Sequence, residues 1–284
     1  MYIRLFGDDL MDIIETVLYS KPDADNVELI DGDWTDNYGL ILVLKENGKF
    51  VVQIGDSKLM LPNFTISCTY PLVRWIDNNC FLIADARNED NTENLYIINL
   101  DGTVLNSFHC GDGIEDIVVS NDGIWISYFD EGVFGHGIST EGLVLFSIQG
   151  ESLFRYHSDL LDRPSIVDCY AICKGTSPSL WLFPYIEFPL LNVNPTKKTV
   201  ETYKVPKVLH GSNGICVRGR FAYFYDRYNS NGEVYCWEFG SKRPQLVGHF
   251  NGTARGLDPS ETNHFISIDD NLVKAYRIIH NEEY

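Results

Sequence analysis

The chain has 284 residues, of which 44% are hydrophobic and 13% aromatic; this is enough to bury a large core and favours β-strands over helices. Forty Asp and Glu against 22 Lys and Arg give a formal net charge of −18, which disfavours direct binding to nucleic acid and favours encounter with a basic partner. Because no run of 18 apolar residues occurs, we expect neither a membrane-spanning helix nor a membrane partner.

The first 20 residues, MYIRLFGDDLMDIIETVLYS, do not resemble a secretion signal. They lack a basic segment followed by a long apolar stretch, and Asp8, Asp9 and Asp12 interrupt the sequence. We therefore expect a cytoplasmic chain. Residues 2–6 are predicted to form a strand, whereas residues 8–20 form either a short helix or part of a divergent element over residues 7–40.

A short pattern then recurs along the chain: an apolar strand, a tight polar turn and a second apolar strand. The first two copies, LILVLKE-NGK-FVVQIG and LYIINL-DGT-VLNSFHC, turn at Asn-Gly and Asp-Gly, which favour hairpins because glycine accepts a positive φ. Five copies occur at spacings of 45 to 54 residues, around Gly48, Gly102, Gly150, Lys197 and Lys242. We interpret each copy as the outer hairpin of a unit, because further strand-like runs precede the hairpins.

Four short strands per repeat of about 45 residues are typical of propeller blades. Five units are predicted near residues 28–55, 69–108, 114–158, 165–205 and 212–250. Residues 254–280 supply only three strands, and the strand at 2–6 can complete this last blade. The sequence therefore predicts a single all-β domain over residues 1–284, a six-bladed β-propeller whose ring is closed by the N-terminal strand, which would remove exposed sheet edges.

Neither the cysteines nor the histidines have the spacing of a metal site. The seven cysteines are odd in number and lie mostly in apolar runs, as expected of buried, reduced thiols. The seven histidines are scattered without an HExxH spacing. We expect no structural metal and no cofactor.

Carboxylates recur where the second strand of a predicted blade ends. Each such acid taken alone is most simply explained as the start of a turn. Together, however, they would form an acidic crescent on one face, which suits the basic surface of a protein. The positions are Asp85, Asp130, Glu131, Glu187, Asp226, Asp269 and Asp270. With the preceding loop HCGDGIED and two aromatic residues, the predicted partner-binding set is Asp112, Glu115, Asp116, Tyr128, Phe129, Asp130, Glu131, Glu187 and Asp226.

An enzymatic function is the alternative. Six-bladed propellers can host Ca²⁺-dependent sugar or lactone hydrolases, and strand-end acids such as Asp85, Asp130, Glu187 and Asp226 are candidate Ca²⁺ ligands. Against this, no GxSxG nucleophile motif is present, and the glycine-rich run GVFGHG lacks the lysine and the helix that a phosphate cradle needs. We therefore expect no catalytic residues and no enzyme.

The segment GDGIEDIVVSNDGIWISYFDEGVFG, residues 111–135, resembles bacterial cytosolic propellers with WD40-like repeats. It covers about one blade, and the GH…WD signature of true WD40 repeats is missing. In its acidity and its lack of catalytic motifs, the chain is similar to immunity proteins of contact-dependent growth inhibition systems that neutralise an EndoU-type nuclease toxin. This resemblance implies a non-enzymatic inhibitor whose acidic face binds a basic RNase toxin. A general protein-interaction scaffold is the remaining alternative.

Overall fold

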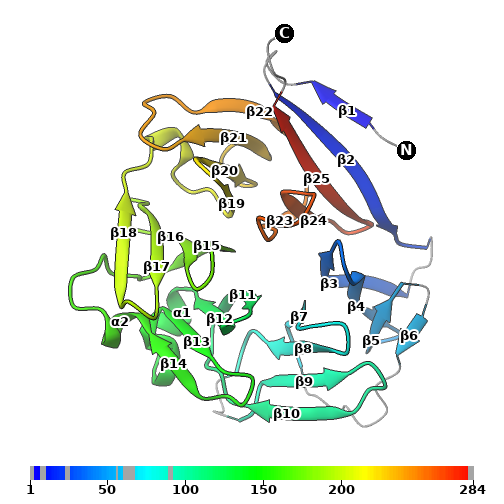
Figure 1. Cartoon of the computed structure of the whole chain (residues 1–284). Coiled ribbons are helices and arrows are strands. Elements are labelled where there is room, and N and C mark those ends of the chain that lie inside the picture. The colour runs from blue at the N-terminus through cyan, green and yellow to red at the C-terminus, as the bar shows by residue number, and fades with distance from the viewer. Residues whose placement is uncertain are drawn as a thin grey trace. The chain divides into compact units, whose positions relative to one another are not determined.

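The computed structural model describes residues 3–6, 11–22, 26–55, 57–59, 68–88 and 92–280. Its strands form six antiparallel sheets in which strands follow one another in chain order, apart from the sheet that joins the two ends of the chain (Figure 1). Five sheets have four strands, and the sixth has a fifth strand added at its edge. The predicted all-β fold with six propeller blades is confirmed.

The chain divides into two compact units: unit I, residues 21–169 and 195–198, and unit II, residues 1–20, 170–194 and 199–284. Unit I holds three blades: β3 (Val27–Thr35), β4 (Gly39–Glu46), β5 (Lys49–Ile54) and β6 (Ser57–Leu59); β7 (Pro71–Trp75), β8 (Cys80–Asp85), β9 (Leu95–Asn99) and β10 (Val104–Phe108); β11 (Ile114–Ser120), β12 (Gly123–Tyr128), β13 (Leu143–Phe146) and β14 (Ser152–Arg155). Its short helices are α1 (Asp130–Val133), η1 (Gly137–Glu141) and α2 (Tyr156–Asp159).

Unit II holds the other three blades: β15 (Cys169–Lys174), β16 (Leu180–Pro184), β17 (Leu190–Asn194) and β18 (Thr199–Tyr203); β19 (Gly214–Arg218), β20 (Phe221–Asp226), β21 (Glu233–Glu238) and β22 (Gln245–His249); and the closing blade with β23 (Thr253–Gly256), β24 (Phe265–Ile268), β25 (Leu272–His280), β2 (Met11–Ser20) and β1 (Ile3–Phe6). A single turn of 3₁₀-helix, η2 (Lys207–Leu209), precedes β19.

The N-terminal segment closes the last blade, but not with the strand that the sequence predicted. The strand β2 pairs with β25 from Met11↔His280 to Ser20↔Leu272, and β1 only adds an outer fifth strand (Figure 1). The short helix considered for residues 8–20 is therefore wrong over the described residues 11–20. Pairing with β25 buries Ile13 in the core, and β-branched residues such as Ile13 and Ile14 favour a strand.

The predicted outer hairpins are confirmed for four of the five copies, where the turns at Gly102, Gly150, Lys197 and Lys242 join the third and fourth strands of a blade. The first copy is different, since Gly48 joins β4 to β5, the second and third strands. Gly55, which lies between β5 and β6, occupies the equivalent place and precedes Gly102 by 47 residues. The predicted spacing of 54 residues between Gly48 and Gly102 is therefore the longest because the first copy lies one strand earlier in its blade than the other copies.

The central strands are covered on both faces, as neighbouring blades require. All six residues of β8 and of β12 are buried, and their near-continuous apolar sequences reflect this. In unit I, Leu82 and Ile97 of one blade share a core cluster with Ile117 and Ile126 of the next. All seven cysteines are buried and carry reduced thiols, as expected.

A buried arginine links the first strands of the three blades of unit I. Arg74 on β7 has its Nη1 2.7 Å from Asp31 Oδ2 on β3 and its Nη2 2.6 Å from Asp116 Oδ1 on β11. Its Nε also donates to the carbonyl of Ile117 at 3.0 Å. Since the Arg74 side chain is only 5% exposed, these contacts compensate a charge that burial would otherwise make costly.

Candidate functional site

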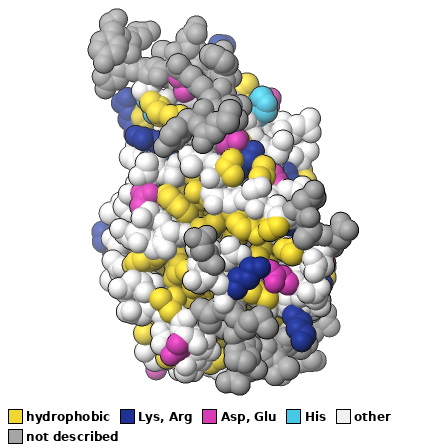
Figure 2. Space-filling model, turned by 90° about the vertical axis from the view of Figure 1, so that its right-hand side faces the viewer, with side chains coloured by type: hydrophobic (Ala, Val, Ile, Leu, Met, Phe, Trp, Pro, Cys, Tyr) yellow, Lys and Arg dark blue, Asp and Glu magenta, His cyan; other side chains and the backbone are white. Residues whose placement is uncertain are grey.

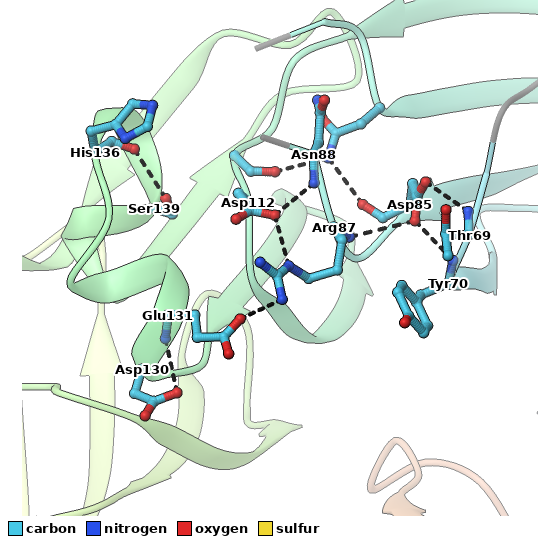
Figure 3. Close-up of polar contacts among 12 residues, drawn as sticks. Thr69, Tyr70, Asp85, Arg87, Asn88, Asp112, Asp130, Glu131, His136 and Ser139 are labelled. Carbon is cyan, nitrogen blue, oxygen red and sulfur yellow. Dashed lines mark hydrogen bonds and ion pairs between the residues drawn. The ribbon is translucent and has the colours of Figure 1, made fainter. Parts of the chain in front are cut away.

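Two strand-end aspartates are occupied by backbone amides of nearby loops. Asp85 ends β8, is 7% exposed, and accepts hydrogen bonds from the amides of Thr69 (2.9 Å) and Tyr70 (3.0 Å) (Figure 3). Asp226 ends β20, is 6% exposed, and accepts from the amides of Tyr228 and Asn229. Asp226 can therefore contribute to a binding surface chiefly through the loop that it holds in place.

Three of the predicted site residues gather around one arginine of unit I. Arg87, in the β8–β9 loop, forms ion pairs with Asp112 at 3.1 Å and with Glu131 of α1 (Figure 3). Its guanidinium also lies 5.7 Å from the ring centroid of Phe129. The Asn88 amide also donates to Asp112 at 2.6 Å. Partial burial raises the pKa of Asp112, but the Asn88 amide and the Arg87 guanidinium outweigh this effect and hold the pKa below its usual value.

A second group of acids in unit I has more carboxyl groups than cationic partners among the described residues. Glu115 follows the first residue of β11; it is accessible to solvent, but its carboxylate is closely surrounded by protein and within the described part of the chain has no ion-pair or hydrogen-bond partner. Desolvation by the surrounding protein, together with nearby Asp116 and Asp168, raises the pKa of Glu115 to about 8. Desolvation and Asp130 likewise raise the pKa of Asp168 to about 6. Asp116 itself is neutralised by Arg74.

The aromatic residues predicted beside these acids are not both accessible. Tyr128 is fully buried, and its hydroxyl donates to the carbonyl of Cys110, so it offers no surface to a partner. Phe129 is half-buried beneath Arg87. The exposed aromatic residues of this region are instead Tyr70, 59% exposed, and Phe134, 72% exposed.

Sequence reasoning missed both of these residues. Tyr70 directly precedes β7, and its amide is held by Asp85. Phe134 directly follows α1, within the glycine-rich run GVFGHG. An aromatic residue in a glycine-rich loop was the available signal for Phe134, because no strand is there to bury it.

Unit II contributes the remaining predicted residues, Glu187 and Asp226. Glu187 is exposed in the β16–β17 loop, where Ile186, Glu187 and Phe188 have φ of +71°, +61° and +48°. The structure thus groups six predicted residues on the exposed or half-exposed loops and strand ends of unit I: Asp112, Glu115, Asp116, Phe129, Asp130 and Glu131.

Among the described residues, no three His, Cys, Asp or Glu side chains are grouped so as to hold a metal ion. Of the candidate Ca²⁺ ligands, Asp85 and Asp226 already accept backbone hydrogen bonds. No helix within the described ranges is long and apolar enough to cross a membrane. On the side of the molecule shown in Figure 2, acidic and basic side chains are interspersed, with hydrophobic side chains between them.

The six blades define the chain as a β-propeller, and comparisons with known proteins support the fold alone. No family model matches the chain, and no curated protein matches it. It is similar to the β-propeller domain of Cps50 (Swd1) from Myceliophteria thermophila, with a TM-score of 0.55 and 11% identity over 99% of this chain and 97% of that one. It is also similar to virginiamycin B lyase from Staphylococcus aureus, with a TM-score of 0.55 and 9% identity over 95% of this chain and 100% of that one.

A third similar structure is much longer. PorZ, a bacterial surface component of the type-IX secretion system of Porphyromonas gingivalis, gives a TM-score of 0.53 at 11% identity over 92% of this chain. The chain spans only 34% of PorZ. Enzymes and non-enzymes thus share this fold, so function has to be argued from the surface of the chain itself.

Proposed function

We propose that the chain is a non-enzymatic binding protein that captures a basic protein on the acidic loops of unit I. The observation that carries this proposal is a pair of carboxylates without a cationic partner among the described residues, Glu115 and Asp168, whose pKa values are raised by desolvation and by neighbouring carboxylates. A cationic side chain placed beside these carboxylates would relieve their repulsion. The exposed rings of Tyr70 and Phe134 lie in the same unit and are suited to serve as apolar anchors.

More specifically, we propose that the partner is a basic nuclease toxin and that the chain is its immunity protein. The net charge of −18 supports this role, since an RNase presents a basic surface to the phosphates of its substrate. Carboxylates on unit I would occupy that surface in place of RNA. The same proposal places the chain in the cytoplasm, where such a toxin meets RNA, and assigns it no catalytic residue.

Affinity capture followed by charge reversal tests the proposal. The chain would be used as bait in lysate of its source cell at low and at moderate salt, and the captured protein would be purified for kinetic measurements. We expect one basic protein whose nuclease activity is inhibited by the chain. The double variant Asp130→Lys/Glu131→Lys should slow its association and reduce the salt dependence of the rate, because both acids lie on exposed α1. An unchanged association rate would refute the acidic surface as the binding site.

A further inference from the structure

The β16–β17 loop of unit II has an unusual backbone. Three consecutive residues that are not glycine, Ile186, Glu187 and Phe188, all have φ in the left-handed region, between +48° and +71°. This region is disfavoured for residues with a Cβ, and most of all for a β-branched residue such as isoleucine. Such a conformation persists only where the surrounding structure holds it, and it is concentrated at binding sites.

Aromatic packing is what holds this loop. The ring of Tyr185 stacks on that of Tyr170, with centroids 6.0 Å apart and an interplanar angle of 16°. Phe188 packs edge-on against both, at 5.2 Å from Tyr170 and 5.5 Å from Tyr185, and its other neighbours include His210 at 5.2 Å. Tyr185 is therefore fixed by its neighbours, although 46% of it remains exposed. A ring fixed in this way loses little conformational entropy when it is bound.

The loop exposes an aromatic ring, an aliphatic side chain and a carboxylate at three consecutive positions. Ile186 is 51% exposed, and Glu187 is exposed, with no ion-pair or hydrogen-bond partner among the described residues. Elsewhere the chain places its own arginines over such rings: Arg227 lies 5.7 Å from the centroid of Tyr228 in the β20–β21 loop, and Arg87 lies 5.7 Å from that of Phe129. Over the described part of the chain, no such cation lies over Tyr185.

We propose that Tyr185, Ile186 and Glu187 form a docking site for an arginine side chain of a basic protein partner. A planar guanidinium stacks on the exposed ring of Tyr185, the carboxylate of Glu187 neutralises its charge, and Ile186 covers the aliphatic stem. Arginine is favoured over lysine because its delocalised, weakly hydrated charge stacks on an aromatic ring more readily than an ammonium does. This site adds a specific contact to the proposed function, and it depends on that function for the premise that the partner is a basic protein.

Hexaarginine and hexalysine peptides, which carry the same charge, test the site directly. Binding of each peptide to the full chain would be followed by isothermal calorimetry and by the backbone amide NMR shifts. We expect hexaarginine to bind about two- to five-fold more tightly than hexalysine, in line with an exposed cation–π contact, with large shifts at residues 185–188. Tyr185→Leu should abolish this preference and Tyr185→Phe should retain it, because only the ring is needed. Tyr228→Leu, in an exposed loop of the same unit, is the matched control and should leave the preference unchanged.

Equal affinities for the two peptides, or a preference that survives Tyr185→Leu, would overturn the site. Its failure is distinguishable from failure of the proposed function. If a captured partner depends on Asp130 and Glu131 but binds Tyr185→Leu normally, the acidic surface stands and this site does not. If the arginine preference maps to Tyr185 while no basic protein is captured, the site stands and the proposed function fails.

Discussion

Glu115 is a carboxylate whose protonation is linked to the stability of the fold. Its pKa is raised to about 8 in the folded protein from an ordinary value of 4.5, by desolvation and by the neighbouring charges of Asp116 and Asp168. Between these two pH values the folded state retains a proton that the unfolded state releases. The contribution of Glu115 to stability is therefore fully present below about pH 4.5 and is lost as the pH rises through about 8.

Replacing Glu115 with glutamine should remove this loss. We expect the Glu115→Gln variant and the parent chain to have similar free energies of unfolding at about pH 4, and the variant to become the more stable of the two by about pH 9. Urea unfolding across this range measures the difference. Glu151→Gln, at an exposed position in a hairpin turn, is the matched control. A Glu115→Gln effect that does not change with pH would show that the carboxylate is not protonated at neutral pH.

The sequence was sufficient to predict which acids lie at strand ends, but not which of them are exposed to solvent. The sequence places Asp85, Asp130 and Asp226 equally at the ends of second strands, yet only Asp130 is exposed. The other two turn inward because backbone amides of the following or neighbouring loop need an acceptor. Tyr128 and Phe134 lie six positions apart, and the first is buried while the second is exposed, because Tyr128 is the last residue of β12 and Phe134 lies in the loop region beyond it. Such differences arise from loop geometry, which periodicity does not encode.

At the scale of single elements, the strand β2 supplies core residues to the closing blade as well as hydrogen bonds. Ile13 is fully buried, and its Cδ1 lies so close to Gly248 of β22 that a Cβ there would meet it at 2.9 Å. Val17, on the same strand, is 47% exposed. We expect Ile13→Ala to lower the free energy of unfolding by about 2–5 kcal/mol, because it leaves a cavity in the packed core.

Val17→Ala is the control for this prediction and should change the free energy of unfolding by at most about 0.5 kcal/mol. Denaturant unfolding of both variants makes the comparison. Equal effects would mean that β2 is held by backbone pairing alone. Alternation along this strand does not reveal the difference, because Ile13 and Val17 are four positions apart and fall on the same face, and the buried acids Asp12 and Glu15 interrupt its apolar pattern. Sequence reasoning therefore assigned closure to residues 2–6, although β1 is only the outer neighbour of β2.

At the scale of the whole molecule, the blade count was predictable because the repeat is long and regular. Four strands and a turn recur at nearly constant spacing, and within each unit neighbouring blades share core clusters, so the apolar runs mark the blades even without sequence identity between them. The binding surface was less predictable, since it depends on which loop side chains remain without partners. The net charge of the sequence predicts the sign of a partner's charge. Only the structure shows that Asp116 is paired with Arg74 whereas Glu115 has no such partner among the described residues.

The net charge of −18 and the local acidic surface make separable predictions about association with the captured basic partner. Asp101 and Glu151 lie in the β9–β10 and β13–β14 turns, at the opposite strand ends from the loops that follow β8 and β12. Five residues of strand separate such ends by about 16 Å. That distance is within the Debye length of about 30 Å at about 10 mM salt but exceeds the length of about 8 Å at about 150 mM.

The double variant Asp101→Lys/Glu151→Lys should therefore slow association at about 10 mM salt, where the field of the whole molecule steers the partner, and associate normally at about 150 mM. Asp130→Lys/Glu131→Lys should slow association at both salt concentrations and also speed dissociation, because the proposed function places these acids in direct contact with the partner. Stopped-flow measurement of both rates separates the two contributions. Identical salt profiles for the two variants would mean that the partner responds only to net charge, and that unit I presents no specific acidic surface to it.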